Sequence, residues 1–177
     1  MSTSINFDLA TGAMNDLFQY DAFLVSKDGA GNPNVMTIGW GCVGVMWSRP
    51  VFMVAVRTSR HTRECLDAHD RFTVCIPGDD SFRKALALCG TKSGRDLDKF
   101  EAAGLITAPA HRVDVPVIAG CKTYYECRVL SATLMDAEGA VPEILAQYYE
   151  KPGSGGLHIL YFGEILDCYE KTAEKQG

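Results

Sequence analysis

Residues 35–56 read VMTIGWGCVGVMWSRPVFMVAV, two apolar runs joined by a short polar corner. The first run extends from Val35 to Val45 and combines β-branched with small residues, and the second extends from Val51 to Val56. Ser48, Arg49 and Pro50 stand between them, residues that favour a turn. Apolar runs on the two sides of a proline-containing corner are typical of neighbouring antiparallel strands. This stretch therefore predicts a β-rich fold.

The same patterns continue on both sides of this stretch. Strands are predicted for residues 23–26, 72–76, 123–135 and 157–167, and short helices for residues 63–68, 81–88, 96–103 and 142–149. Thr58 and Ser59 are suited to cap the first helix. Gly90 and Gly104 stand where the second and third should end, and Pro142 lies in the first turn of the last.

Many strands and few short helices indicate a mainly β fold with peripheral helices, a closed or nearly closed antiparallel barrel. A doubly wound parallel sheet needs strands that alternate with helices, and residues 20–57 contain no such alternation. The length of 177 residues and the absence of a linker or repeat predict a single domain over residues 1–177.

Composition excludes several classes of protein. Hydrophobic residues make up 47% and charged residues 22%, and the net charge of −5 argues against a sequence-independent nucleic-acid binder. The seven cysteines contain no Cys-x-x-Cys, and the closest pair is Cys121 and Cys127. We interpret them as buried thiols in a reducing compartment and predict no metal site.

The chain shows no signal-peptide pattern and no run of the roughly 20 apolar residues that would span a bilayer. We therefore expect a cytoplasmic protein with no membrane partner.

Gly39, Gly41 and Gly44 match the dinucleotide fingerprint G-x-G-x-x-G. That fingerprint acts at a strand-to-helix turn, and Pro50 leaves no room for a helix here. The glycines instead indicate a strand that another backbone or a ligand approaches closely.

Residues 57–63, Arg-Thr-Ser-Arg-His-Thr-Arg, hold the strongest chemical signal. Three arginines and three hydroxyls stand where a strand passes into a helix, and a helix N-terminus attracts phosphate. Arginine adds planar bidentate donors. A plain helix cap with solvated arginines explains this segment equally well.

Two further segments could contribute to the same ligand site as residues 57–63. Residues 89–100 again combine hydroxyls, cations and glycines ahead of a helix, although such a loop is more often merely solvated. The strand at residues 34–40 mixes small, apolar and aromatic residues, so its backbone could approach a flat ring; alone it reads as a core strand.

Together these motifs resemble the flavin-reductase-like family, and most of all its flavoredoxin branch. The matching motifs are Asn34-x-Met36-Thr37-Ile38-Gly39-Trp40, Trp47-x-x-Pro50, Val54-x-Val56-Arg57-x-Ser59-Arg60-x-Thr62, Cys89-Gly90-x-x-Ser93-Gly94-x-Asp96-x-Asp98-Lys99-Phe100, and His158 to Glu164. They occur in family order from about residue 15 to residue 167. The resemblance implies an FMN-binding split β-barrel with a Greek-key core that forms a homodimer.

The resemblance also implies roles for individual residues. Ser59, Arg60 and Thr62 would hold the FMN phosphate, Ser93 and Lys99 would approach it or the ring from the second loop, and Arg57 belongs to the same motif. Thr37, Ile38, Gly39 and Trp40 would line the ribityl chain and the isoalloxazine ring.

His158 is the one candidate for a catalytic role, and a structural histidine is the alternative. Leu157 stands where the family often has Asp, a departure that bears on any contact between His158 and a nicotinamide. We expect a flavin reductase that uses NADH or NADPH. The alternatives are an electron carrier that takes electrons from a redox protein partner, and a barrel that has lost its flavin.

Overall fold

The structure is a computed structural model, and it describes residues 5–170. Seven strands form one antiparallel sheet in the order β2-β1-β5-β8-β9-β4-β3. Their bounds are β1 Ala22–Lys27, β2 Pro33–Ile38, β3 Gly41–Met46, β4 Arg49–Arg57, β5 Arg71–Ile76, β8 Thr123–Leu134 and β9 His158–Glu170. A separate pair consists of β6 Thr107–Ala108 and β7 Val117–Ile118.

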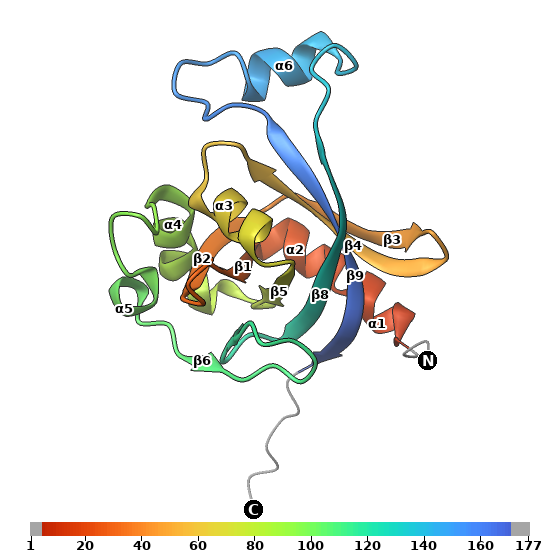
Figure 1. Cartoon of the computed structure of the whole chain (residues 1–177), viewed down its shortest axis with the longest axis vertical. Coiled ribbons are helices and arrows are strands. Elements are labelled where there is room, and N and C mark those ends of the chain that lie inside the picture. Colours follow the sequence, from red (N-terminus) through yellow and green to blue (C-terminus); the bar gives the residue numbers. More distant parts are fainter. Residues whose placement is uncertain (1–4, 171–177) are drawn as a thin grey trace, which may run out of the picture.

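The strand connections are those of a Greek key. β5, β8 and β9 are consecutive strands of this sheet along the chain, and they also lie side by side in it. β4 precedes β5 in the sequence, but it pairs with β9. The sheet curls, and its strands wrap around the helices packed beside them (Figure 1). The predicted mainly β Greek-key fold is confirmed.

The predicted β3–β4 neighbours are confirmed, but the run from Val35 to Val45 is two strands rather than one. The chain bends at Gly39 and Trp40, and the Trp40 carbonyl accepts a hydrogen bond from Ala55 N at 3.3 Å. At Gly41 a Cβ would lie 2.8 Å from the Met53 carbonyl oxygen. The glycine is therefore needed for the close backbone approach that the sequence indicated, and no helix follows it.

Helices pack on both faces of the sheet. They are α1 Phe7–Gly12, α2 Met14–Tyr20, α3 His61–Ala68, α4 Arg83–Thr91, α5 Lys99–Ala103 and α6 Pro142–Tyr148, with a 3₁₀ turn at Asp80–Phe82. Residues of α1, α2 and α3 join the apolar cluster that contains Leu24, and residues of α4 join the one that contains Phe23 and Val25. Sequence analysis missed α1 and α2. Tyr125 donates to the Ala10 carbonyl at 2.6 Å, a contact that ties α1 to β8.

Two predicted helix ends need correction. Gly90 does not end a helix but lies inside α4, where a Cβ would sit 3.4 Å from Thr37 Cβ, so it lets α4 pack against β2. α5 begins at Lys99 and not at residue 96, because Asp98 caps it by accepting from Phe100 N and Glu101 N. Gly104 does end α5, with φ of 62°.

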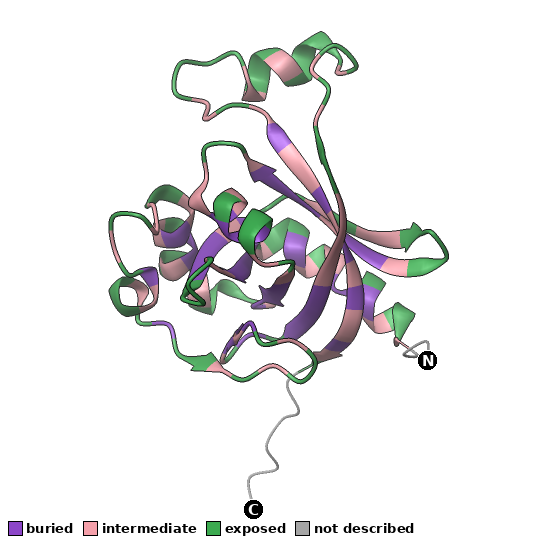
Figure 2. Ribbon diagram, viewed as in Figure 1, coloured by how far each residue is buried: buried purple, intermediate pink, exposed green. Residues whose placement is uncertain are grey.

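The core lies between the curled sheet and the helices (Figure 2). Phe52, Phe72 and Tyr125 are fully enclosed in its larger apolar cluster. All seven cysteines are free, and six are buried as predicted. Cys42 is the exception: it lies exposed on the edge strand β3.

Beyond the barrel, β8 and β9 continue outward and carry α6 at some distance from the other helices (Figure 1). We refer to residues 135–157, which join these two strands, as the arm. Among residues 5–170, no helix is long and apolar enough to cross a membrane.

Candidate functional site

A cleft of about 330 Å³ opens where β4 passes into α3. Its walls come from the β4–α3 junction, the loop at residues 91–95 with Lys99, and the glycine-rich end of the arm at Gly153–Gly155. We call it the basic cleft. Of the predicted residues, it gathers Arg57, Ser59, Arg60, Thr62, Ser93 and Lys99.

The N-terminus of α3 faces this cleft without a side-chain cap. The capping residue is Arg60, and not Thr58 or Ser59 as predicted, and the Arg60 side chain makes no capping hydrogen bond. The first amides of a helix have no intrahelical acceptor, and together they carry a partial positive charge. This end of α3 therefore offers hydrogen-bond donors to an anion.

Arg60 carries a positive charge that no acidic residue within 5–170 offsets. Its half-buried guanidinium makes no hydrogen bond or ion pair with any residue in the described range 5–170. Burial lowers the pKa of Arg60, and the neighbouring Arg57 lowers it further. Because a buried charge without a partner is costly, this arrangement favours an anionic ligand.

Lys99 adds a second such charge. Only 5% of it is exposed, and its Nζ has two long contacts of 3.5 Å, to the carbonyl oxygens of Cys89 and Lys92. Burial lowers the pKa of this ammonium, and Arg60 contributes to the shift. Within the described part of the chain Lys99 forms no salt bridge.

Arg57 holds the arm against the barrel. Its Nη1 donates to the Gly156 carbonyl at 2.8 Å and its Nη2 to the Tyr148 carbonyl at 3.2 Å. The guanidinium carbon also lies 5.9 Å from the Trp40 ring centroid and 5.3 Å from that of Tyr149. Arg57 thus lines the basic cleft and also holds the arm beside it.

Thr62 is hydrogen-bonded by Asn34, a residue of the quoted motifs to which sequence analysis assigned no role in the site. Its side chain is 1% exposed, and its hydroxyl accepts a hydrogen bond from Asn34 Nδ2 at 2.9 Å. That bond uses a lone pair of Thr62 Oγ1 and leaves the hydroxyl hydrogen free to donate. Asn34 Oδ1 is buried and has no hydrogen-bond partner in the structure.

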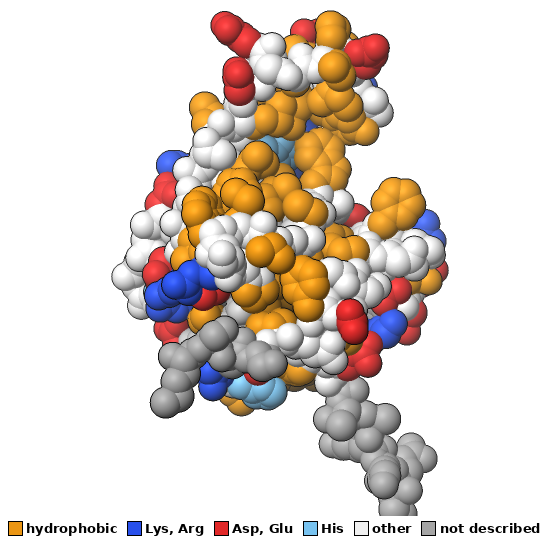
Figure 3. Space-filling view, turned by 90° about the vertical axis from the view of Figure 1, so that its right-hand side faces the viewer, with side chains coloured by type: hydrophobic (Ala, Val, Ile, Leu, Met, Phe, Trp, Pro, Cys, Tyr) orange, Lys and Arg blue, Asp and Glu red, His pale blue; other side chains and the backbone are white. Residues whose placement is uncertain are grey.

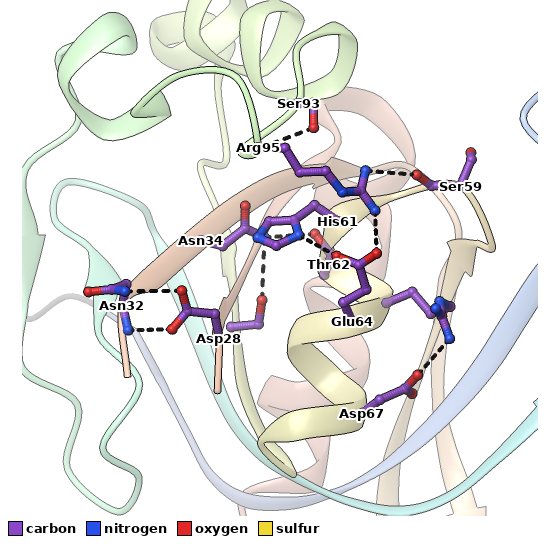
Figure 4. A network of polar contacts seen from close by, with 12 residues as sticks. Asp28, Asn32, Asn34, Ser59, His61, Thr62, Glu64, Asp67, Ser93 and Arg95 are labelled. Carbon is purple, nitrogen blue, oxygen red and sulfur yellow. Dashed lines mark hydrogen bonds and ion pairs between the residues drawn. The ribbon is translucent and has the colours of Figure 1, made fainter. Parts of the chain in front are cut away.

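A network of ion pairs connects the loop at residues 91–99 to α3 (Figure 4). Arg95 donates to Glu64 Oε1 at 2.7 Å and to the Ser59 carbonyl at 3.3 Å, and His61 lies 2.8 Å from Glu64 Oε2. The hydrogen bond from Arg95, and after it the one with His61, lowers the pKa of Glu64 to about 2. Ser93 Oγ accepts from Arg95 N at 3.1 Å. Sequence analysis counted Arg95 among the cations of residues 89–100 but did not predict its ion pair with Glu64, because that contact joins two segments distant in the sequence.

A second cleft of about 150 Å³ adjoins the first and shares Met36, Arg57 and Arg60 with it. We call it the aromatic cleft. It gathers the other predicted residues, namely Thr37, Ile38, Gly39, Trp40 and His158.

β2 forms one wall of the aromatic cleft. β2 is an edge strand, so one side of its backbone has no strand beside it. The Ile38 side chain is buried in the core, and the Thr37 hydroxyl donates to the Leu86 carbonyl at 2.7 Å. What β2 offers a ligand here is therefore mainly backbone.

His158 closes the other side of the aromatic cleft. It is 7% exposed, its ring centroid lies 4.6 Å from that of Trp40, and its Nδ1 lies 2.8 Å from Tyr149 Oη. Burial lowers the pKa of His158 to about 4, with help from Arg57 and Arg60. His158 is therefore uncharged at neutral pH. Sequence analysis did not predict that Tyr148 and Tyr149 lie at this site. Tyr148 packs edge to face on Trp40, with ring centroids 4.9 Å apart.

One further polar cluster lies outside the two clefts. Ligand atoms of His111, Glu126 and Asp167 come within 4.8 Å of one another. However, Glu126 already accepts from the amides of His111, Arg112 and Val113 and from the Tyr169 hydroxyl. Its carboxylate therefore anchors the loop at residues 111–113.

Comparison with known proteins gives a family. A model of the flavin reductase like domain matches residues 14–177. An uncharacterised protein of Archaeoglobus fulgidus is 30% identical over 149 residues, which are 84% of this chain and 72% of that protein. The uncharacterised protein YddH of Escherichia coli is 31% identical over 106 residues; the match spans 59% of this chain and 55% of YddH.

Solved structures agree on the fold. A flavoredoxin of Desulfovibrio vulgaris superposes with a TM-score of 0.66 at 20% identity, covering 86% of this chain and 69% of that one. An FMN-binding domain of a flavin-reductase-like enzyme from Shewanella baltica gives 0.62 at 22% identity, covering 89% and 72%. A protein with a split barrel domain from Shewanella frigidimarina gives 0.67 at 18% identity, covering 89% and 69%. With a family model over most of its length and this split-barrel fold, the chain belongs to the flavin reductase-like domain family.

Proposed function

We propose that this protein binds FMN, with the phosphate in the basic cleft and the isoalloxazine ring along the aromatic cleft, and that it passes electrons through the flavin. One observation carries the proposal. Arg60 and Lys99, two partly or fully buried cations without an acidic partner in residues 5–170, meet at the uncapped N-terminus of α3. A phosphate dianion would offset both charges.

The residues present fit such a ligand. Arg60, Lys99, the first amides of α3 and the Thr62 hydroxyl would hold the phosphate, and Ser59 and Ser93 border the same cleft. The backbone from Thr37 at the end of β2 to Gly39 just beyond it would lie along the ring's polar edge, with Trp40 and His158 beside it. When bound, FMN supplies hydride acceptance and one- or two-electron transfer, and the protein supplies orientation and electrostatics.

The comparisons support this assignment. The Shewanella baltica structure is described as an FMN-binding domain, and one from Thermus thermophilus as an FMN-binding protein with p-hydroxybenzaldehyde bound. FMN binding is typical of the family to which this chain belongs.

A titration with two flavins tests the phosphate assignment. FMN should bind more tightly than riboflavin, which has the same ring and no phosphate, when flavin fluorescence is followed during addition of protein. Equal affinity for the two flavins would contradict the placement of the phosphate in the basic cleft.

For the electron donor we propose NADH or NADPH, which makes the protein a flavin reductase. The alternative, an electron carrier of the flavoredoxin type that takes electrons from a redox protein partner, is favoured by the likeness to flavoredoxins of Desulfovibrio vulgaris and Methanosarcina acetivorans. Oxidation of NADH and NADPH with free FMN supplied distinguishes the two. Turnover supports a reductase, and a bound flavin that neither nicotinamide reduces supports the carrier.

We also propose that the protein is a cytoplasmic homodimer. Apolar side chains gather on the face of the molecule that carries the β3 hairpin (Figure 3). Trp47 and Val45 of this hairpin are 57% and 63% exposed, and Leu134, Val141 and Ile144 at the base of the arm and on α6 are exposed as well. An apolar face of this kind marks an interaction site, and a second copy of the chain would cover it.

Light scattering tests the dimer. The wild type should show twice the mass of one chain, and Val45→Asp together with Trp47→Lys should give monomers. Ile106→Asp is the control, because Ile106 is 72% exposed but lies next to β6, away from the hairpin. A monomeric wild type at micromolar concentration with FMN bound would contradict the proposal.

A further inference from the structure

Tyr149, which follows α6, forms a hydrogen-bonded pair with His158, which begins β9 and lines the aromatic cleft. Tyr149 Oη lies 2.8 Å from His158 Nδ1, and the two rings meet edge to face with centroids 5.6 Å apart. Trp40 packs against the imidazole from another side. The imidazole is thus held in one orientation by a residue of the arm and a residue of the barrel.

The hydrogen of the Tyr149 hydroxyl decides which form His158 adopts. Two acceptors lie within reach of Tyr149 Oη: His158 Nδ1 at 2.8 Å and Met135 Sδ at 3.2 Å. A thioether sulfur is a weak acceptor, whereas an imidazole nitrogen lone pair is a good one, so the hydrogen goes to Nδ1. Burial raises the pKa of Tyr149, so the phenol keeps its hydrogen at neutral pH.

The remaining imidazole hydrogen must then lie on Nε2. His158 is uncharged at neutral pH because burial, Arg57 and Arg60 lower its pKa to about 4. A neutral imidazole carries one hydrogen, and Nδ1 is the acceptor of the bond from Tyr149. His158 Nε2 is not among the fully buried atoms that lack a partner, and His158 lines the aromatic cleft. Nε2 therefore opens toward the cleft.

We propose that Tyr149 is a positioning residue that fixes His158 in the Nε2–H form, so that His158 offers an uncharged hydrogen-bond donor to a carbonyl oxygen of a ligand in the aromatic cleft. This inference rests on the proposed flavin site. Carbonyl oxygens occur on the pyrimidine edge of the flavin ring and on the carboxamide of a nicotinamide. In this role His158 Nε2–H donates a hydrogen bond to the ligand, and neither His158 nor Tyr149 transfers a proton to it.

The tautomer is measured on the flavin-free protein, labelled with ¹⁵N in its four histidines. Long-range ¹H–¹⁵N spectra at neutral pH separate protonated from unprotonated ring nitrogens, and the signals missing from His158→Gln assign His158. We expect Nε2 protonated and Nδ1 unprotonated in the wild type, and a mixture of the two forms in Tyr149→Phe. A wild-type His158 protonated at Nδ1 would overturn the proposal, and so would an unchanged form in Tyr149→Phe.

Tyr148→Phe is the matched control. Tyr148 also lies at the end of α6, but its hydroxyl accepts from Gln147 Nε2 at 3.0 Å and not from His158, and phenylalanine keeps the ring that contacts Trp40. Tyr148→Phe should leave the His158 signals unchanged. Because the spectra need no flavin, failure to bind FMN would refute the proposed function without affecting this measurement.

Two additions then identify the carbonyl. If the ring edge is the acceptor, FMN alone should shift the His158 Nε2 signals, and the midpoint potential of bound FMN should move in His158→Leu but much less in His158→Gln, which keeps an N–H donor. If the second substrate is the acceptor, only NADH or NADPH added to the FMN-loaded protein should shift them. Signals that respond to neither addition would overturn the donor role.

Discussion

The basic cleft and the aromatic cleft adjoin and share Met36, Arg57 and Arg60, but their ionisable side chains differ in charge. In the basic cleft, Arg60 and Lys99 keep positive charges that no acidic group in residues 5–170 offsets. In the aromatic cleft, burial together with Arg57 and Arg60 keeps His158 uncharged. One cleft is suited to an anion, and the other to neutral hydrogen bonds with a ring.

The two clefts also differ in how the chain builds them. The basic cleft is formed largely by two short segments, residues 57–62 and 91–99, with the end of the arm as cover. The aromatic cleft needs β2, β4 and the first residue of β9, and Tyr149 of the arm holds that residue in place. Changes in the first should therefore affect affinity for phosphate, and changes in the second should affect stability and the ring.

The largest expected effect concerns His158 and pH. The unfolded chain binds a proton at this residue near the usual pKa of 6.5, whereas the folded protein binds it only near pH 4. As pH falls through this window the unfolded state gains a proton that the folded state does not, so the free energy of unfolding should fall by up to about 3 kcal/mol. Above the window His158 should contribute no pH dependence.

Urea unfolding of the wild type and of His158→Gln on both sides of this window measures the effect. The variant should lose most of the His158-dependent decrease. Parallel curves for the two proteins would mean that His158 is solvated, and the contrast between the two clefts would then be broken.

The next effect is on phosphate binding. Arg60→Ala should weaken FMN roughly ten- to hundred-fold, because a charge-assisted hydrogen bond contributes about 1.5–3 kcal/mol, and it should leave riboflavin almost unchanged. Arg63→Ala is the control, since Arg63 lies on the same helix but pairs with Asp67 at 2.9 Å. If Arg60→Ala weakens both flavins equally in a folded protein, Arg60 serves the ring and not the phosphate.

Lys99→Met should change FMN affinity and protein stability in different directions. FMN should bind more weakly than to the wild type, though with a smaller loss than in Arg60→Ala, since an ammonium is a point charge and not a planar fork. Burial lowers the pKa of Lys99, so its protonated form destabilises the folded state at neutral pH, and the free protein should unfold at the same or a higher denaturant concentration in the variant. A less stable variant would show that the ammonium is needed by the fold itself.

The smallest effect is expected for Thr62→Ala. It removes a neutral donor worth about 0.5–1.5 kcal/mol toward the phosphate, and riboflavin affinity should not change. Asn34→Ala should reproduce part of this loss, because Asn34 orients the Thr62 hydroxyl. In the Thr62→Ala background, Asn34→Ala should have little further effect on the ratio of FMN to riboflavin affinity. A full additional loss would mean that Asn34 acts through another contact.

The sequence by itself located the segments that form the large sheet, four of the six α-helices and six residues of the basic cleft, although it did not separate β2 from β3 and did not indicate β6 or β7. Apolar runs, the Pro50 corner and the stop at Gly104 act over a few residues, so they are visible without the fold. The same holds for residues 57–62, because a strand-to-helix junction with hydroxyls and arginines is a local feature.

The tertiary structure alone decided the contacts between distant segments. Gly90 lies within α4 and faces Thr37 of β2, and the arm contacts Arg57 through the carbonyls of Tyr148 and Gly156. Local patterns cannot show such contacts, since each joins residues that are tens of positions apart. The form of His158 was decided in the same way, because its burial and its charged neighbours exist only once β4, β9 and the arm have come together.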